Sequence, residues 1–279
     1  MTVIFYIFIF GLIIGSFLNA VIYRLEAKKS VCRGRSFCPE CKHILAWYDL
    51  IPLLSFIFLG GKCRYCHQEI SIQYPLVELA TGLLFVLIFP LVGGSRPMAG
   101  QFSIFNLSYG FYIISILIVI FVYDLKYYII PDKIILPAII VSSLWSLSAG
   151  NYLKIENWKL PAQGWSALGG EIIDVNSLLA AFGASAFFLS LIIISKGRWM
   201  GFGDVKLAFL MGLILSFPNI LVALFTAFIS GAIIGAGLIL FKKKDLKSQI
   251  PFGPFLAGGT IFSLFFGEII INWYLNILL

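Results

Sequence analysis

TVIFYIFIFGLIIGSFLNAVIY occupies residues 2–23 and contains no charged side chain. An apolar stretch of about 20 residues is long enough to cross the roughly 30 Å of hydrocarbon in a bilayer. The stretch has no basic segment before it and no small-residue cleavage site before Tyr23, so we expect a retained transmembrane helix and not a removed signal peptide. This segment therefore indicates a membrane protein.

The rest of the chain is also rich in long apolar stretches. It has 279 residues, of which 60% are hydrophobic and 12% charged, and its mean hydropathy is +0.99. Soluble domains do not reach this composition. The sequence predicts an all-α polytopic membrane protein with about eight transmembrane helices, near residues 2–23, 75–93, 109–123, 132–149, 177–195, 203–217, 219–241 and 254–278.

The net charge of +7 does not indicate nucleic-acid binding, because its distribution follows the predicted topology. If the N-terminus lies outside, alternate loops fall in the cytoplasm and hold all but three of the 20 lysines and arginines. Only Arg96, Lys154 and Lys159 remain outside. This asymmetry is the positive-inside pattern of a multi-pass protein of the cytoplasmic membrane, so the basic residues report orientation in a lipid bilayer.

The polar stretch between the first two spans, residues 24–74, is predicted to be a small cytoplasmic insert. We divide the chain into a first helix at 1–23, this insert, and a transmembrane domain at 75–279. The insert contains two CxxC units, in which the four cysteines are Cys38, Cys41, Cys63 and Cys66. Two such turns can present four thiolates to one tetrahedral Zn²⁺, which would be structural because no coordination position stays open.

Other interpretations of the cysteines remain open. The four could form two disulfides, although the cytoplasm keeps thiols reduced. His43 and His67 lie beside the CxxC units and could substitute as ligands, and Cys32 is expected to be a free thiol. A segment of about 50 residues buries little core, so a metal would supply folding energy that burial does not.

Acidic residues are rare near the spans, and three of them draw attention. Asp124 ends the third span, where a carboxylate opposes the helix dipole. Asp132 and Asp204 each begin a span, so helix capping would explain them, and this is our interpretation of Asp132. Gly201 and Gly203 flank Asp204 and would permit close approach of a substrate strand. The charge pattern puts Asp124 and Asp204 on the same cytoplasmic side.

Two carboxyl groups that meet in a partly dry site do not both ionise easily, so the pair keeps one proton. The ionised carboxylate can then take a proton from water while its partner polarises a scissile carbonyl, as in aspartic proteases. The sequence predicts this chemistry only if two different helices bring Asp124 and Asp204 together.

At this point the chain resembles the bacterial type IV prepilin peptidases, which are membrane aspartyl proteases of the GxGD type. The resemblance runs nearly end to end, and its combination and order make it specific. It is carried by GSFLNAVIYRL (15–25), the CxxC pair, WYDLIPLLSF (47–56), KCRYCHQEISIQYPLVELATG (62–82), YDLKYYIIPD (123–132), GFGDVKLA (201–208) and PFGPFLAGG (251–259).

The resemblance implies that Asp124 and Asp204 are the catalytic pair. It also implies substrates that are prepilins and type II secretion pseudopilins, cleaved after a glycine that ends a basic leader, on the cytoplasmic face of the inner membrane. Members with the insert are implied to N-methylate the new N-terminus with S-adenosylmethionine. Four acids of the matched region are weak candidates for that donor site and also fit capping or salt-bridge roles: Glu26, Asp49, Glu69 and Glu78.

Two other classes of protein remain as alternatives. An ion-coupled transporter would place its acids near the bilayer midplane, whereas this pair is interfacial. A zinc-knuckle membrane scaffold that only docks partners would not need Asp124 or Asp204. The outer loop at 150–176 has no assigned role.

Overall fold

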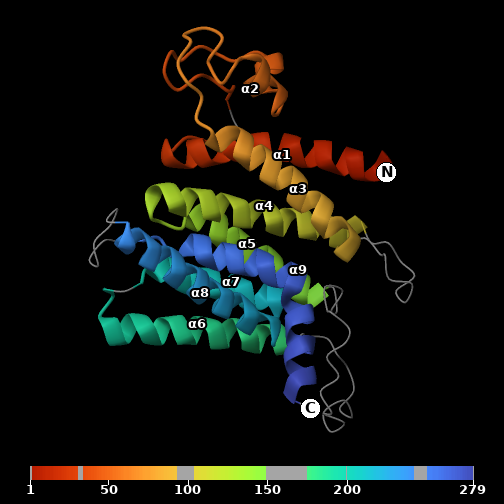
Figure 1. Cartoon of the computed structure of the whole chain (residues 1–279), viewed down its shortest axis with the longest axis vertical. Helices are drawn as coiled ribbons and strands as arrows, with labels where there is room; N and C mark the ends of the chain where they lie inside the picture. Colours follow the sequence, from red (N-terminus) through yellow and green to blue (C-terminus); the bar gives the residue numbers. More distant parts are fainter. Residues whose placement is uncertain are drawn as a thin grey trace. The chain divides into compact units, whose positions relative to one another are not determined.

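The protein is all-helical in a computed structural model that describes residues 2–30, 34–92, 104–148, 175–198, 200–241 and 250–278. These ranges contain no β-strand, only two isolated β-bridges. The helices are α1 (Thr2–Glu26), the 3₁₀ helix η1 (Trp47–Leu50), α2 (Leu54–Phe58), α3 (Gln73–Val92), α4 (Ile104–Tyr127), α5 (Asp132–Ser148), α6 (Val175–Ser195), α7 (Phe202–Leu215), α8 (Asn219–Leu240) and α9 (Gly253–Leu278) (Figure 1).

Each of the eight predicted spans corresponds to one of these helices, so the predicted fold class is confirmed. Within the described ranges, six helices are long and apolar enough to cross a bilayer: α1, α3, α4, α6, α8 and α9. The other two, α5 and α7, have 17 and 14 residues. Cys32 and nearly all of the outer loop 150–176 lie outside the described residues. The predicted domain boundaries at residues 24 and 75 stay a prediction.

The chain forms two compact units, Met1–Val119 and Ile120–Leu279, and α4 runs from the first into the second. In the first unit, α1 packs along α3 through small residues. A Cβ placed on Gly11 would lie 2.7 Å from the Cα of Gly82, and one placed on Gly15 would lie 2.7 Å from the Cα of Glu78. Such close backbone approach is how membrane helices gain packing contacts without a hydrophobic driving force.

In the second unit, α7 lies at the centre, because α5, α6, α8 and α9 all pack against it. Ten of its 14 residues are buried. A helix that is apolar on every side needs neighbours on every side, which explains why so short a helix is stable here. Its first turn carries Asp204, so the packing of four helices fixes the position of that carboxylate.

The α1–α3 contact generates a stability prediction. Gly15→Ala adds a methyl group that would overlap the α3 backbone, and overpacking of this kind costs about 1–3 kcal/mol. The purified variant in detergent should therefore melt at a lower temperature than the wild type, measured by the loss of the monodisperse peak after heating.

Gly183→Ala in α6 is the matched control, because a Cβ there has no neighbour within 4 Å among the described residues. Alanine favours a helix over glycine by about 1 kcal/mol, so this variant should melt at or above the wild-type temperature. Equal melting of Gly15→Ala and the wild type would contradict the close packing of α1 on α3.

Candidate active site and metal centre

Asp124 lies in the last turn of α4 and is buried. Helix α4 ends because Tyr128 adopts a left-handed conformation, with φ of +59°, while its N–H donates to the Asp124 carbonyl at 2.9 Å. The carboxylate of Asp124 accepts a hydrogen bond from the backbone N–H of Gly253, the first residue of α9. A carboxylate at a helix C-terminus is thus offset by a donor at the N-terminus of another helix.

Asp204 is the third residue of α7 and is also buried. Its Oδ2 atom accepts a hydrogen bond from the Gly201 N–H at 3.3 Å. This is the reciprocal half of a capping box, the half that does not need a side chain at Gly201. Asp204 therefore caps α7, and the contact uses only one of its carboxylate oxygens.

The structure brings Asp124 and Asp204 close enough for their charges to interact unfavourably. Ile130, which is buried, lies beside both Gly203, next to Asp204, and Gly253, which contacts Asp124. A Cβ on Gly203 would lie 3.1 Å from the Ile130 Cβ, and a Cβ on Gly253 would lie 3.3 Å from the Ile130 Cδ1. Both glycines thus pack closely against the same side chain.

Gly253 has a second and tighter contact. A Cβ on this residue would lie 2.5 Å from the Asp124 Oδ2 and 3.0 Å from its Cγ. Real Cβ atoms do not approach other atoms this closely, so only glycine fits without displacing the carboxylate. Sequence reasoning gave Gly253 and Ile130 no role, although both lie in the strings PFGPFLAGG and YDLKYYIIPD.

The glycines beside Asp204 differ from the simple expectation that both leave room for a substrate. Gly203 faces Ile130, whereas a Cβ on Gly201 would meet, among the residues that the structure describes, only the Gly203 nitrogen, at 3.9 Å. The open space next to Asp204 is therefore on the Gly201 side.

Asp132 differs from the buried pair, Asp124 and Asp204, because it is exposed. It begins α5, and 59% of its side chain is exposed. Its Oδ1 accepts a hydrogen bond from the Lys206 Nζ at 2.6 Å, in an ion pair that joins the starts of α5 and α7. Sequence reasoning predicted a helix start at Asp132 but did not find Lys206 as its partner.

The four predicted cysteine ligands come together in the insert. Their sulfur atoms all lie within 4.8 Å of one another, and the Sγ atoms of Cys38 and Cys66 are 3.9 Å apart. Four sulfurs at about 2.3 Å from a tetrahedral Zn²⁺ would be about 3.8 Å from each other. The donor set and its spacing therefore fit a structural zinc ion.

The two CxxC turns repeat one backbone design at an offset of 25 residues. The Cys38 N–H donates to the His43 carbonyl at 2.9 Å, and the Cys63 N–H donates to the Gln68 carbonyl at 2.8 Å. Lys42 and His67, at matching positions, have φ of +58° and +57°. Isolated bridges close both turns, between Phe37 and Ile44 and between Lys62 and Glu69. Such paired turns are typical of zinc knuckles.

Among the described residues, the metal-ligating cluster consists of the four cysteines alone. The His43 ring stacks on Tyr65, with ring centroids 3.7 Å apart. His67 is exposed. Neither histidine is needed as a ligand.

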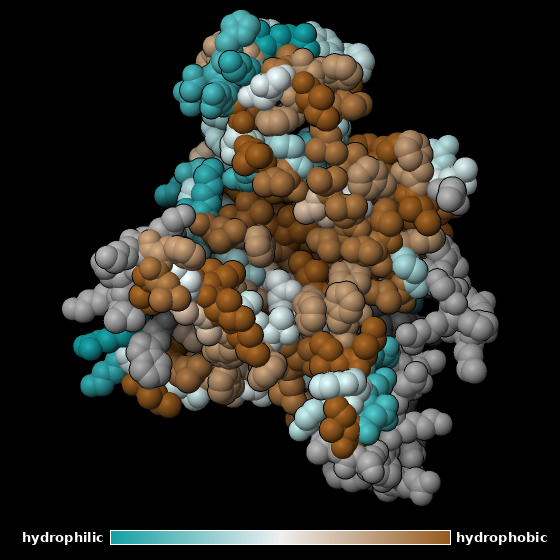
Figure 2. Space-filling model, in the orientation of Figure 1, coloured by the Kyte–Doolittle hydropathy of each residue, from teal (hydrophilic) through white to brown (hydrophobic). Residues whose placement is uncertain are grey.

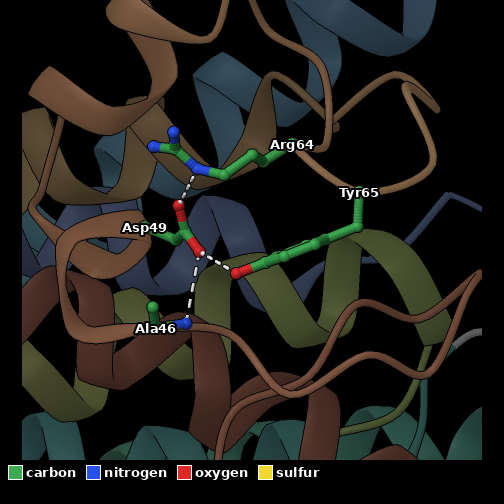
Figure 3. A network of polar contacts seen from close by, with 4 residues as sticks. All are labelled: Ala46, Asp49, Arg64 and Tyr65. Carbon is green, nitrogen blue, oxygen red and sulfur yellow. Dashed lines mark hydrogen bonds and ion pairs between the residues drawn. The ribbon is translucent and has the colours of Figure 1, made fainter.

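Asp49, one of the four weak candidates for the donor site, is held within the insert (Figure 3). It accepts hydrogen bonds from the Arg64 Nε at 2.8 Å, the Tyr65 hydroxyl at 3.2 Å and the Ala46 N–H at 3.2 Å. Its side chain is only 3% exposed. Burial alone would raise the pKa of Asp49, but Arg64 and the other two donors lower it below its ordinary value. Asp49 therefore links η1 to the second CxxC turn.

Glu78 is also occupied by protein contacts. It is buried and accepts hydrogen bonds from the Leu53 N–H at 2.8 Å and from the Ser16 hydroxyl. Glu26 and Glu69 are exposed. Their assignment to a methyl-donor site stays a prediction.

Two family models match the chain. The model described as the bacterial peptidase A24 N-terminal domain covers residues 9–91, and the model of the type IV leader peptidase family covers residues 111–236. The first contains all four cysteines, and the second contains both buried aspartates. No solved structure matches the chain.

Curated relatives match over nearly the whole length. The prepilin leader peptidase/N-methyltransferase of Bacillus subtilis (strain 168) is 32% identical, over 98% of this chain and 98% of the relative. Its namesake in Aeromonas salmonicida (strain A449) is 31% identical, over 98% and 94%. The protein of that name from Klebsiella pneumoniae is 34% identical, over 74% and 82%. With such matches along its length, the chain belongs to the type IV leader peptidase family.

Proposed function

We propose that this protein is a membrane aspartyl endopeptidase that removes the leader of prepilins and pseudopilins, with Asp124 and Asp204 as its catalytic pair. The observation that carries the proposal is that two buried carboxylates from different helices lie near enough for their charges to interact, in a chain that has few acids. Burying two carboxylates near each other costs stability, so such a pair in a membrane protein indicates a functional role. The names of the relatives support the substrate class.

The proposed reaction uses the pair in its singly protonated form. The ionised carboxylate removes a proton from water, and the resulting hydroxide adds to the scissile carbonyl carbon. The protonated carboxyl gives its proton to the carbonyl oxygen, so a neutral tetrahedral intermediate forms. On its collapse the leaving nitrogen receives the proton taken from water and the C–N bond breaks. One hydroxyl of the intermediate returns a proton to the second carboxylate as the new carboxyl group forms, so the pair is again singly protonated. The protein contributes position and proton transfer.

The hydrogen bonds to the pair support this mechanism. Gly253 and Gly201 each direct a backbone N–H at one aspartate, so neither carboxylate rotates freely. Held in this way, the two groups need little rearrangement when a substrate arrives. The space on the Gly201 side is where an extended substrate strand would approach.

We also propose N-methylation of the new N-terminus, as the names of the relatives suggest. Bound S-adenosylmethionine would supply an electrophilic methyl group, which the free amine accepts. Two of the four candidate acids, Asp49 and Glu78, already have protein partners, so neither is a buried carboxylate awaiting a ligand. We therefore derive no step from these residues toward the donor.

For the insert we propose a structural zinc ion bound by the four cysteines. The charge asymmetry further supports an inner-membrane location, with the N-terminus outside and the aspartate pair on the cytoplasmic side. Membership of the leader peptidase family disfavours the transporter and docking-scaffold alternatives, and the variants below test them directly.

Asp124→Asn and Asp204→Asn should each abolish leader cleavage. Loss of a general acid or base lowers rates by about 10²–10⁴-fold, and the amide cannot take part in the proton transfer. The assay incubates purified protein with a synthetic prepilin peptide and separates the products by mass spectrometry.

Asp132→Asn is the matched control, because it removes an exposed carboxylate next to the same helices. An exposed ion pair contributes up to about 1 kcal/mol, so cleavage should fall by less than about fivefold. Wild-type cleavage by either of the other two variants would remove that aspartate from the mechanism.

Gly253→Ala should lower kcat by about a hundredfold while leaving KM nearly unchanged. The added Cβ would overlap the Asp124 carboxylate, and a misplacement of about 1 Å is enough for a loss of this size. Steady-state cleavage kinetics measure both constants. Gly237→Ala in α8, where a Cβ has no neighbour within 4 Å, should behave as the wild type. A normal kcat for Gly253→Ala would show that Asp124 does not need this contact.

The purified wild type should contain about one zinc ion per chain, determined by elemental mass spectrometry. Cys38→Ser combined with Cys63→Ser should lose it, because two of four ligands are gone. Limited proteolysis should then cut within residues 34–72 while the second unit stays intact. A wild-type protein without zinc would overturn the metal assignment.

A further inference from the structure

The insert exposes an apolar face formed by six side chains of η1 and α2. Three of them are strongly exposed: Trp47 at 76%, Ile57 at 68% and Phe58 at 84%. Tyr48, Leu50 and Leu54 are also exposed, and η1 packs beside α2. We call these six residues the insert face. Figure 2 shows hydrophobic surface on the flank of the insert and hydrophilic surface at its outer end.

A domain in water would not present such a surface. Contiguous apolar patches on soluble proteins mark contacts with a membrane, a ligand or another protein. Trp47 and Phe58 together carry two large rings with little cover, although the insert has buried Cys38 and Cys63 and has satisfied Asp49 internally. The insert thus buries these two cysteines and pairs Asp49 internally, while the insert face stays exposed.

A hydrogen bond fixes the depth of the insert face along the helices that carry the insert. Leu53, the residue before α2, donates its N–H to Glu78 at 2.8 Å. Glu78 is the sixth residue of α3, a membrane-spanning helix that starts at Gln73. At 1.5 Å per residue, the contact lies about 7.5 Å along the axis from the start of α3. Ser16 of α1 contacts the same carboxylate.

The helices show apolar side chains to their surroundings at this depth. Leu76 and Leu79, on either side of Glu78 in sequence, are exposed on α3. Exposed apolar side chains on a helix of membrane length suit contact with lipid. Helix α2 therefore begins at the level of the first turns of an apolar helix of membrane length, which is the depth expected for an interface.

The residue types of the insert face suit that boundary. Trp and Tyr are enriched at membrane interfaces, where an apolar ring and a polar edge are both accommodated. Arg64, whose guanidinium lies 4.9 Å from the Tyr48 ring centroid, places a cation beside these aromatic rings, where it can reach lipid phosphates. Lys42 and Gln68, in the two CxxC turns, are exposed polar residues outside the insert face.

We propose that the zinc-binding insert is seated in the membrane interface, with the insert face inserted among the lipids at the surface where α1 ends and α3 begins. The insert is then a peripheral membrane domain held at fixed depth, and not a domain free in the cytoplasm. Interfacial helices of this kind bury their apolar face about 5–10 Å into the headgroup region. The inference does not depend on the proposed peptidase chemistry.

The test uses full-length protein in phosphatidylcholine vesicles. The photoreactive amino acid p-benzoylphenylalanine replaces Phe58 in one variant and Gln68, an exposed polar residue outside the insert face, in another. After irradiation, intact-protein mass spectrometry should show a phospholipid adduct for position 58 and none for position 68. Zinc content equal to that of the wild type confirms that each variant has folded.

Every other outcome overturns the proposal. A cross-linked product of twice the chain mass for the position 58 variant would identify a second copy of the chain as the partner. The absence of any adduct there would leave the face in water or against the same chain. Equal lipid adducts at both positions would show unspecific contact.

A second measurement keeps the wild-type side chains. Vesicles contain lipids with bromine atoms either near the headgroup or near the chain ends, and bromine quenches tryptophan emission at contact. The emission of Trp47 is the difference between the wild type and Trp47→Phe. The shallow bromines should quench this emission at least about twice as strongly as the deep ones, because a side chain seated in the interface lies near the headgroups. No quenching by either lipid would contradict it.

Discussion

Helix α9 comes so close to the Asp124 carboxylate that no side chain fits between them. This contact decides much of the second unit. It requires glycine at position 253, it directs that residue's N–H at the carboxylate, and it leaves Ile130 to fill the neighbouring space against Gly203. A carboxylate buried in an apolar bundle is stable only when its lone pairs find donors. Here the donor is a backbone group, which no rotamer change can withdraw.

The central helix α7 complements this arrangement. Its burial by four neighbours holds Asp204, which in turn caps α7 through Gly201. Asp204 thus caps the start of α7 and also places a carboxylate near Asp124. Asp132 also has two roles, because it begins α5 and forms an ion pair with Lys206 of α7. Positioning near the pair therefore rests on helix termini, where backbone groups are free to bind side chains.

Sequence patterns predicted what depends on composition and spacing. Apolar blocks of membrane length marked the eight helices, and the paired CxxC units marked the sulfur cluster that the structure brings together. Contacts across the fold were different. The packing of Ile130 against two glycines and the reach of Lys206 to Asp132 depend on how helices cross, which no local pattern encodes. The sequence marked Gly253 only as part of the string PFGPFLAGG and did not show that its partner is Asp124.

Within the insert, the chain of contacts runs from the metal-ligand turn to the apolar face. The turn between Cys63 and Cys66 carries Arg64 and Tyr65, and these two side chains hold Asp49. Asp49 lies in η1 and fixes the Ala46 N–H at its start.

The same 3₁₀ helix presents Trp47 and Tyr48, so the shape of the insert face depends on the order of the second turn. A structural metal at the cysteines would therefore do more than fold a small domain. It would also set how aromatic side chains meet the membrane, because the hydrogen bonds of Asp49 tie η1 to the second turn.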